Sequence, residues 1–167
     1  VMKRSTTGLD LEGCRIDKDL LLEKCRFLDM PVLSGARLAS LNLQGSCFPG
    51  LHADRMKMRG DVLLRQVEVK GEMLLIGASI GGDLDCEGGR FDNTGGDALS
   101  ADRLKAGGNV FLSGVQVEGE VRLLGARIGG DLSCVGGQFE NIGGRALHAQ
   151  GAEVKGGFFW RDASHAK

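Results

Sequence analysis

The sequence predicts an all-β fold, a single right-handed parallel β-helix with about 22 residues per coil. Two observations predict it. Apolar residues recur two positions apart, the period of a strand face, and then skip three positions, which fits a corner between short strands. Three successive blocks with this pattern begin at regular intervals, at Val110, Val121 and Leu132, and the same three blocks begin earlier in the chain at Val62, Met73 and Leu84.

The blocks account for nearly the whole chain. A polar lead at residues 2–6 precedes the first block, and Pro31 takes the first apolar slot of the third. The apolar stripe and capping residues of a helix do not occur. About thirteen blocks give six to seven coils, hence a rod of roughly 30 Å. The expected blocks are 9–16, 20–27, 33–38, 41–48, 51–58, 62–69, 73–80, 84–91, 99–106, 110–117, 121–128, 132–139 and 147–154, with a broken one at 158–160.

Glycine marks the junctions between blocks, where we expect it to supply turn conformations that other residues resist. Four residues that follow these glycines, Asp61, Asp83, Asn109 and Asp131, form one column with a member on every coil. Such corner residues accept hydrogen bonds from nearby backbone N–H groups, so we expect turn chemistry there in preference to cation binding. The junction glycines are Gly60, Gly71, Gly82, Gly108, Gly119, Gly130 and Gly157.

Inward pairs such as Ala101 with Leu104 resemble the pentapeptide-repeat β-helix, in which five-residue units each build one side of a square coil. One extra residue in every second unit separates this sequence from that pattern, so a three-sided coil stays open as an alternative. Runs such as residues 80–91 also resemble repeats in bacterial proteins labelled membrane-associated oxidoreductases, a likeness that covers nearly the whole chain and carries no catalytic motif. Residues 117–121 resemble the bactofilin type of polymerising β-helix, whose coil is shorter.

Composition bounds the function. A chain of 167 residues fits one domain with a real core, and 28 Gly with two Pro, one Trp and no Tyr is not an enzyme-like mixture. The net charge of −1 predicts no nucleic-acid partner, and the lack of a long apolar run predicts no direct membrane insertion. We expect a cytoplasmic chain, with any membrane association left to other parts of the parent protein. Val1 before Met2 and an ending within a block suggest that residues 1–167 are a segment of a longer protein.

Residues that often carry chemistry are poorly placed for it here. The five Cys are odd in number and mostly fall in apolar slots, which indicates reduced core thiols. Cys86 and Cys134 share one inward slot two coils apart, about 10 Å, too far for a disulfide. His52 and His148 share an outward slot but stand too far apart to bind one zinc ion. We therefore predict no catalytic residue, no metal site and no cofactor.

Two features are candidate binding surfaces. One is an outward apolar column with polar residues on alternate coils, to which Leu74 adds area nearby. A monomer seldom exposes such a stripe without using it. The other is a pair of insertions of about five residues in the two later cycles, which leave the same corner two coils apart. The column holds Leu21, Leu63, Phe111 and Phe159, and the insertions hold Asp92, Asn93 and Asp97, and Glu140, Asn141 and Arg145.

The sequence thus predicts a non-catalytic β-solenoid scaffold, or a protein-binding and assembly module. Its expected partner is a protein, either a second copy or another domain of the parent protein. The alternative is an enzyme, or an enzyme-associated domain, with its site in the corner loops or in a missing part of the parent. A DNA mimic would need a strongly acidic surface, which the near-neutral balance disfavours.

Overall fold

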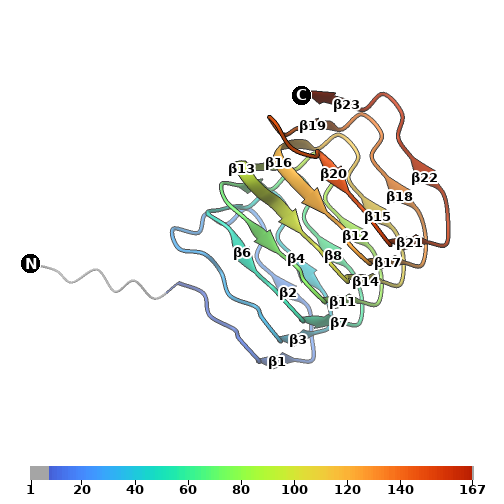
Figure 1. The fold of residues 1–167 in the computed structure, drawn as a ribbon. Helices are drawn as coiled ribbons and strands as arrows, with labels where there is room; N and C mark the ends of the chain where they lie inside the picture. The colour runs from blue at the N-terminus through green and yellow to red at the C-terminus, as the bar shows by residue number, and fades with distance from the viewer. Residues whose placement is uncertain (1–7, 167) are drawn as a thin grey trace, which may run out of the picture.

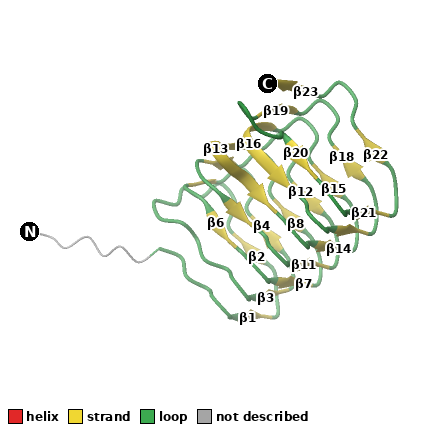
Figure 2. Cartoon of the chain, in the orientation of Figure 1, coloured by secondary structure: helices red, strands yellow, loops and turns green. Residues whose placement is uncertain are grey.

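The chain folds into a parallel β-solenoid of about seven turns, with about 22 residues per turn (Figure 1). The computed structural model describes residues 8–166. Every strand pairing within them is parallel, and the described residues contain no helix (Figure 2). The all-β prediction and the coil length are therefore confirmed, while the right-handed sense stays a prediction.

Three of the turns carry four short strands, and in two others a single longer strand runs along two sides. In the second turn the four strands are β3 (Arg37–Leu38), β4 (Leu41–Asn42), β5 (Cys47–Phe48) and β6 (Leu51–His52). The next turn pairs with all four sides in the same order. The coil therefore has four strand-bearing sides, which decides against the three-sided alternative.

Stacked turns build three sheets. Sheet I contains β3 with β1 (Arg15–Ile16), β7 (Lys57–Met58), β11 (Ser79–Ile80), β14 (Lys105–Ala106), β17 (Arg127–Ile128) and β21 (Glu153–Val154). Sheet II contains β4 with β2 (Leu20–Leu21), β8 (Val62–Leu63), β12 (Leu84–Asp85), β15 (Val110–Phe111), β18 (Leu132–Ser133) and β22 (Phe158–Phe159). Sheet III covers the remaining two sides with β5, β6, β9 (Glu68–Val69), β10 (Met73–Leu74), β13 (Arg90–Ser100), β16 (Gln116–Arg122), β19 (Gln138–Glu140), β20 (Leu147–His148) and β23 (Ser164–Ala166).

The inward positions form the core that the sequence predicted. One inward column has alternating ring and aliphatic side chains, so that bulky residues on one turn face smaller ones on the next. Gly89 and Gly137 make room for the rings, because a Cβ there would lie 2.8 and 2.6 Å from Cε2 of Phe91 and of Phe139. The column consists of Phe48, Val69, Phe91, Val117 and Phe139, all buried.

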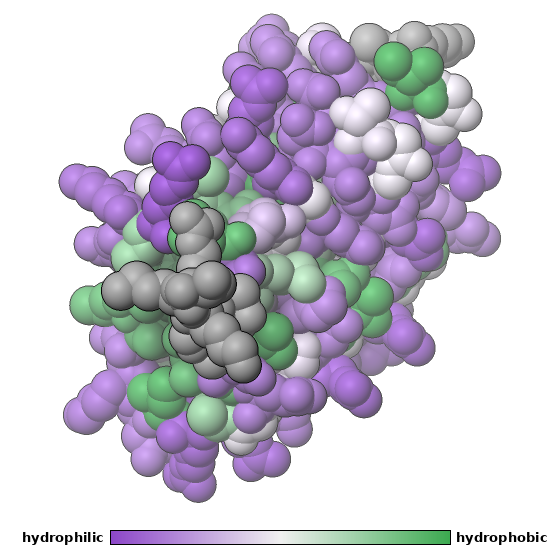
Figure 3. Space-filling view, turned by 90° about the vertical axis from the view of Figure 1, so that its left-hand side faces the viewer, coloured by the Kyte–Doolittle hydropathy of each residue, from purple (hydrophilic) through white to green (hydrophobic). Residues whose placement is uncertain are grey.

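The two end turns are less well covered. Trp160 stacks on Phe139, with ring centroids 5.0 Å apart, and so covers part of the last turn as expected. Phe159 faces outward, and Phe158 stays 54% exposed. At the opposite end the apolar side chains of the first turn, such as Phe27, are only partly buried. That end shows apolar patches on a mostly hydrophilic surface (Figure 3). The polar lead lies outside the described residues.

The corner between sheets I and II has a ladder of side-chain to backbone hydrogen bonds. Asp83 N–H donates to Asp61 Oδ1 at 2.8 Å, and Asn109 N–H donates to Asp83 Oδ1 at 2.6 Å. Asp131 N–H and Gly157 N–H continue the ladder, at 2.8 and 2.7 Å. The expected turn chemistry is confirmed, and each bond also ties one turn to the next.

The role predicted for the junction glycines is wrong in most cases. Of the seven, Gly119 alone has a positive φ, at 125°. At Gly82, Gly108 and Gly130 the constraint is space, because a Cβ would overlap the Oδ1 atom that belongs to the ladder. The left-handed turns lie inside the blocks instead, and there Arg103 adopts φ 57°.

The insertions add five residues each relative to the first cycle, as expected, because Phe48 and Leu51 lie only three positions apart there. Relative to the turn between them the insertions add four. Phe91 and Leu99 lie eight positions apart, whereas their paired residues Val117 and Val121 lie four apart. The turns that contain an insertion are correspondingly longer than the others, as the spacing of the sheet I strands along the chain shows. Pairing resumes in register after each insertion.

The ladder can be tested at Gly108. The substitution Gly108→Ala should lower the free energy of unfolding by about 1–3 kcal/mol, because the new methyl group displaces the Asp83 carboxylate from Asn109 N–H. Urea denaturation followed by circular dichroism measures the change. Gly60→Ala is the matched control, since its nearest neighbour would be a carbonyl oxygen at 3.3 Å. Equal losses in the two variants would contradict the space requirement.

Candidate functional site

Outward side chains form columns along the rod. Each two-residue strand turns one side chain inward and one outward, and the parallel register places outward residues of successive turns about 4.8 Å apart. A surface on this protein is therefore a set of columns. Three regions of this surface have a distinctive set of side chains: the predicted apolar column, the two insertions, and the outward face of sheet I.

The apolar column on sheet II has the predicted alternation but is not a continuous stripe. Leu21 is 65% and Phe159 is 37% exposed, whereas Leu63 and Phe111 are partly buried. Leu74 does not belong to it, because Leu74 lies in sheet III between His52 and Ser100. One block, which is half a turn, separates Leu63 from Leu74, so they face opposite sides of the coil. In register, the outward residues of sheet II are Leu21, Asn42, Leu63, Asp85, Phe111, Ser133 and Phe159.

Asp85 is the buried centre of this column, with 2% of its surface exposed. Its carboxylate accepts a hydrogen bond from Arg65 Nε at 2.6 Å and another from Glu87 N–H at 3.1 Å. The hydrogen bond from Arg65, reinforced by the charge of Asp85, raises the pKa of Arg65. Leu63 and Phe111 flank this ion pair on the neighbouring turns. The pair thus carries a compensated charge, and the apolar side chains shield it.

The two insertions leave the same corner, as predicted. In each, an Asn side chain closes the loop: Asn93 Nδ2 donates to the carbonyl of Asp97 at 2.8 Å, and Asn141 Nδ2 to that of Arg145 at 2.7 Å. The turn between them contributes Glu118, so Asp92, Glu118 and Glu140 stack in register. The loops share a hollow of about 40 Å³, far below the several hundred Å³ of a typical ligand pocket.

Charged groups beside the first insertion pair with one another. Arg122 lies 2.7 Å from an oxygen of Asp102 and 3.5 Å from one of Asp97. The hydrogen bond to Asp102, outweighing partial burial, raises the pKa of Arg122. His148 lies 3.1 Å from Glu120, on the turn before it. No group of three or more metal-ligating side chains occurs among the described residues.

The five cysteines differ in how deeply they are buried. Cys86 and Cys134 are buried in one inward column with Leu112 between them, as predicted. Desolvation raises the pKa of Cys86 strongly and raises that of Cys134 to about 12. Cys14 is exposed in the first turn, so the core expectation fails for it, and Cys25 and Cys47 are intermediate. The two buried thiols stay protonated and unreactive at neutral pH.

The outward face of sheet I carries a column of cations that whole-chain charge did not reveal. Five of its seven positions are Arg or Lys, all exposed, and Glu153 is the single anion. Arg55 and Arg103 flank the column at one corner, and Arg59 and Lys155 at the other. We call the seven positions the basic column; in register they are Arg15, Arg37, Lys57, Ser79, Lys105, Arg127 and Glu153.

The sequence contained a signal for this column. In every turn it occupies the slot immediately before the last inward residue of a block, as in Arg37–Leu38 and Lys57–Met58. A net charge of −1 conceals it, because acids elsewhere in the chain balance these cations. Summing charge by column would have found it.

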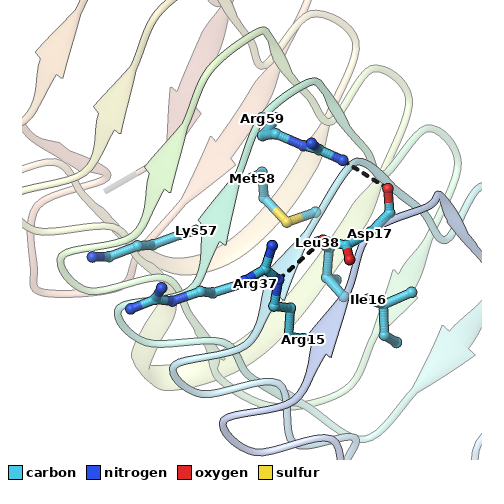
Figure 4. Close-up of a pocket in the computed structure, with 8 residues that line it drawn as sticks. All are labelled: Arg15, Ile16, Asp17, Arg37, Leu38, Lys57, Met58 and Arg59. Carbon is cyan, nitrogen blue, oxygen red and sulfur yellow. Dashed lines mark hydrogen bonds and ion pairs between the residues drawn. The ribbon is translucent and has the colours of Figure 1, made fainter.

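Figure 4 shows the first-turn end of the basic column, where side chains border a hollow of about 250 Å³. Arg15 Nε lies 3.0 Å from Asp17 Oδ1, and Arg59 donates to the Asp17 carbonyl at 2.7 Å. No ion pair between described residues involves Arg37 or Lys57. Their neighbouring like charges repel by up to about 1 kcal/mol per pair in water at this spacing.

The fold and these surfaces define the class of the protein: a parallel β-solenoid whose outer faces carry ordered columns of apolar and of cationic side chains. Comparisons with protein-family models, with curated proteins and with solved structures found no match. No helix among residues 8–166 is long and apolar enough to cross a membrane.

The buried thiols give a prediction on pH dependence. The pKa of Cys134 is about 12 in the folded chain against an ordinary 9.0, so above pH 9 the unfolded chain loses a proton that the folded chain keeps. Stability should therefore be complete below pH 9 and fall by about 1.4 kcal/mol per pH unit for each such thiol between pH 9 and 12. Urea melts across this range measure the slope.

A Cys86→Ala, Cys134→Ala double variant should have a shallower alkaline slope than the wild type. Thiol labelling at about pH 8 should modify Cys14 and leave Cys86 and Cys134 unmodified until the chain unfolds. Rapid labelling of Cys134 in the folded protein would contradict its burial.

Proposed function

We propose that this β-solenoid is a non-catalytic scaffold that assembles with a second copy of itself through the outward column of sheet II. The observation that carries the proposal is the order of residues in that column. Apolar side chains recur on alternate turns from Leu21 to Phe159, and Asp85 lies at the middle position. The order is nearly the same in both directions.

Such an order suits an interface with two-fold symmetry. In an antiparallel pair centred on Asp85, Leu63 faces Phe111 of the second copy, and Leu21 faces Phe159 of the second copy. An isologous interface requires this self-complementarity, because each patch meets itself reversed. Asn42 then faces Ser133, so polar positions also meet polar positions.

The central carboxylates would otherwise oppose the contact. Asp85 of one copy approaches Asp85 of the other, but each is already hydrogen-bonded to its own Arg65. The charge is thus compensated within each copy before association. Burial of the flanking apolar side chains supplies the favourable free energy, about 25 cal/mol per Å² before the costs of association.

Analytical ultracentrifugation over a range of concentrations tests this assembly. The double variant Leu63→Ser, Phe111→Ser should weaken the dimer at least about tenfold, because it removes both central apolar contacts. Serine is the choice because Ser133 already occupies this column. Thermal melts of the same variant separate lost association from lost stability.

The matched control is Leu28→Ser, Ile142→Ser. These side chains are 85% and 83% exposed and lie outside sheet II, so the control should associate like the wild type. A wild type that stays monomeric at the highest concentration would refute the proposal. Equal weakening in both double variants would refute the assignment to sheet II.

A further inference from the structure

We propose that the basic column of sheet I is a docking face for duplex nucleic acid, bound through its phosphate backbone without sequence preference. The inference is independent of self-association, since it concerns a different face of the coil. It starts from the three adjacent cation pairs, Arg15–Arg37, Arg37–Lys57 and Lys105–Arg127, which stand on neighbouring strands. The net charge of the whole chain predicted no such partner, but a phosphate backbone contacts one face only.

Acids stack in register on sheet III, at Asp92, Glu118 and Glu140, but among the described strands neighbouring cations occur on sheet I alone. Directly opposed like charges on paired strands destabilise a sheet. On the first side of sheet III the cations Arg26 and Arg90 are separated by Cys47 and Glu68. On sheet II, Asp85 is the single charged outward residue, and Arg65 neutralises it. Sheet I gathers cations without such spacing, and an external anion is the partner that would relieve their repulsion.

The side chains present on sheet I indicate which kind of polyanion it would bind. The large exposed apolar side chains among the described residues are Leu21, Leu28, Ile142, Phe158 and Phe159, and none lies on sheet I. Single-stranded nucleic acid binds through aromatic platforms on which bases stack, and this face has none. Stable membrane docking combines cations with an inserted apolar group, which is absent here too. Duplex backbone requires cations alone.

The dimensions agree with a duplex lying along the rod. Five turn-to-turn steps separate Arg15 from Arg127, roughly 24 Å, which matches the rise of about seven base pairs. Arg55 and Arg103 lie beside Asp54 at one corner, and Arg59 lies beside Asp17 at the other, so cations outnumber acids in the first of these groups and match them in the second. Arg37, Lys57 and Lys105 have no ion pair with another described residue, so they can contact phosphates without first breaking one.

Fluorescence anisotropy with a labelled random-sequence duplex of about 20 base pairs tests the proposal on the full 167-residue chain. Contacts to about four phosphates predict that affinity falls roughly 150-fold between about 50 and 200 mM salt. The charge-reversal variant Arg37→Glu, Lys57→Glu, Lys105→Glu should lose at least about 100-fold in affinity at the lower salt.

The control is Arg26→Glu, Lys70→Glu, Arg145→Glu, which makes the same change in net charge at exposed positions off sheet I. It should keep affinity within about threefold of the wild type, and circular dichroism melts check that both variants fold. Equal losses in the two variants would overturn the assignment to sheet I. Absence of duplex binding at low salt would overturn the proposal, as would tighter binding to phosphatidylserine-containing vesicles. Ultracentrifugation of the same variants shows whether they still self-associate, so that a loss of duplex binding is distinguished from a loss of assembly through sheet II.

Discussion

Parallel pairing of each turn with the next places every residue about 4.8 Å from its counterpart one turn earlier, and the rest of the structure depends on this spacing. Inside the coil it requires neighbouring side chains of compatible size, which the alternation of Phe48, Val69 and Phe91 provides. At the corners it brings backbones so close that Gly81 and Gly107 have no room for a Cβ. On the outside, a residue type that recurs at the same position of successive turns forms a column of like side chains along one face.

The same spacing brings like charges together in the corner ladder and in the basic column, and the two sets of charges have different surroundings. In the corner ladder, each carboxylate accepts a hydrogen bond from the next turn, and Asn109 interrupts the run of acids while donating through Nδ2 to Asp83 at 3.1 Å. Repulsion there is offset within the fold. On sheet I, Arg15 pairs with Asp17 and Arg127 pairs with Glu153, whereas Arg37, Lys57 and Lys105 are exposed and form no ion pair with a described residue. The contrast is why we assign the ladder to stability and the basic column to binding.

Residue spacing predicted the inside of this protein well. The inward position of Cys86 and Cys134 followed from the regular period of the blocks, because that period arises from burial of one face of each strand. Spacing also placed Leu21, Leu63, Phe111 and Phe159 in one column. It could not say why a glycine was needed, because a glycine that supplies a positive φ and a glycine that supplies space look alike in the sequence.

Two errors about the surface have a common physical cause. Leu74 was grouped with Leu63 because both are outward and apolar, yet one block is half a turn, and half a turn reverses the direction of a side chain. The basic column was missed because charge was summed over the chain instead of along one side of the coil. In a solenoid the side on which a residue lies is set by its position within the turn, so surface properties are readable only after each residue is assigned to its side.

The placement of the insertions leaves sheets I and II free of projecting loops. Turns differ in length, yet the extra residues of the long turns all emerge within sheet III. Register on sheet I runs unbroken from Arg15 to Glu153, and on sheet II from Leu21 to Phe159. A linear polyanion or a second rod needs such an uninterrupted face, because a loop projecting from the middle would hold the partner away. The long insertions are therefore confined to the one sheet to which we assign neither partner.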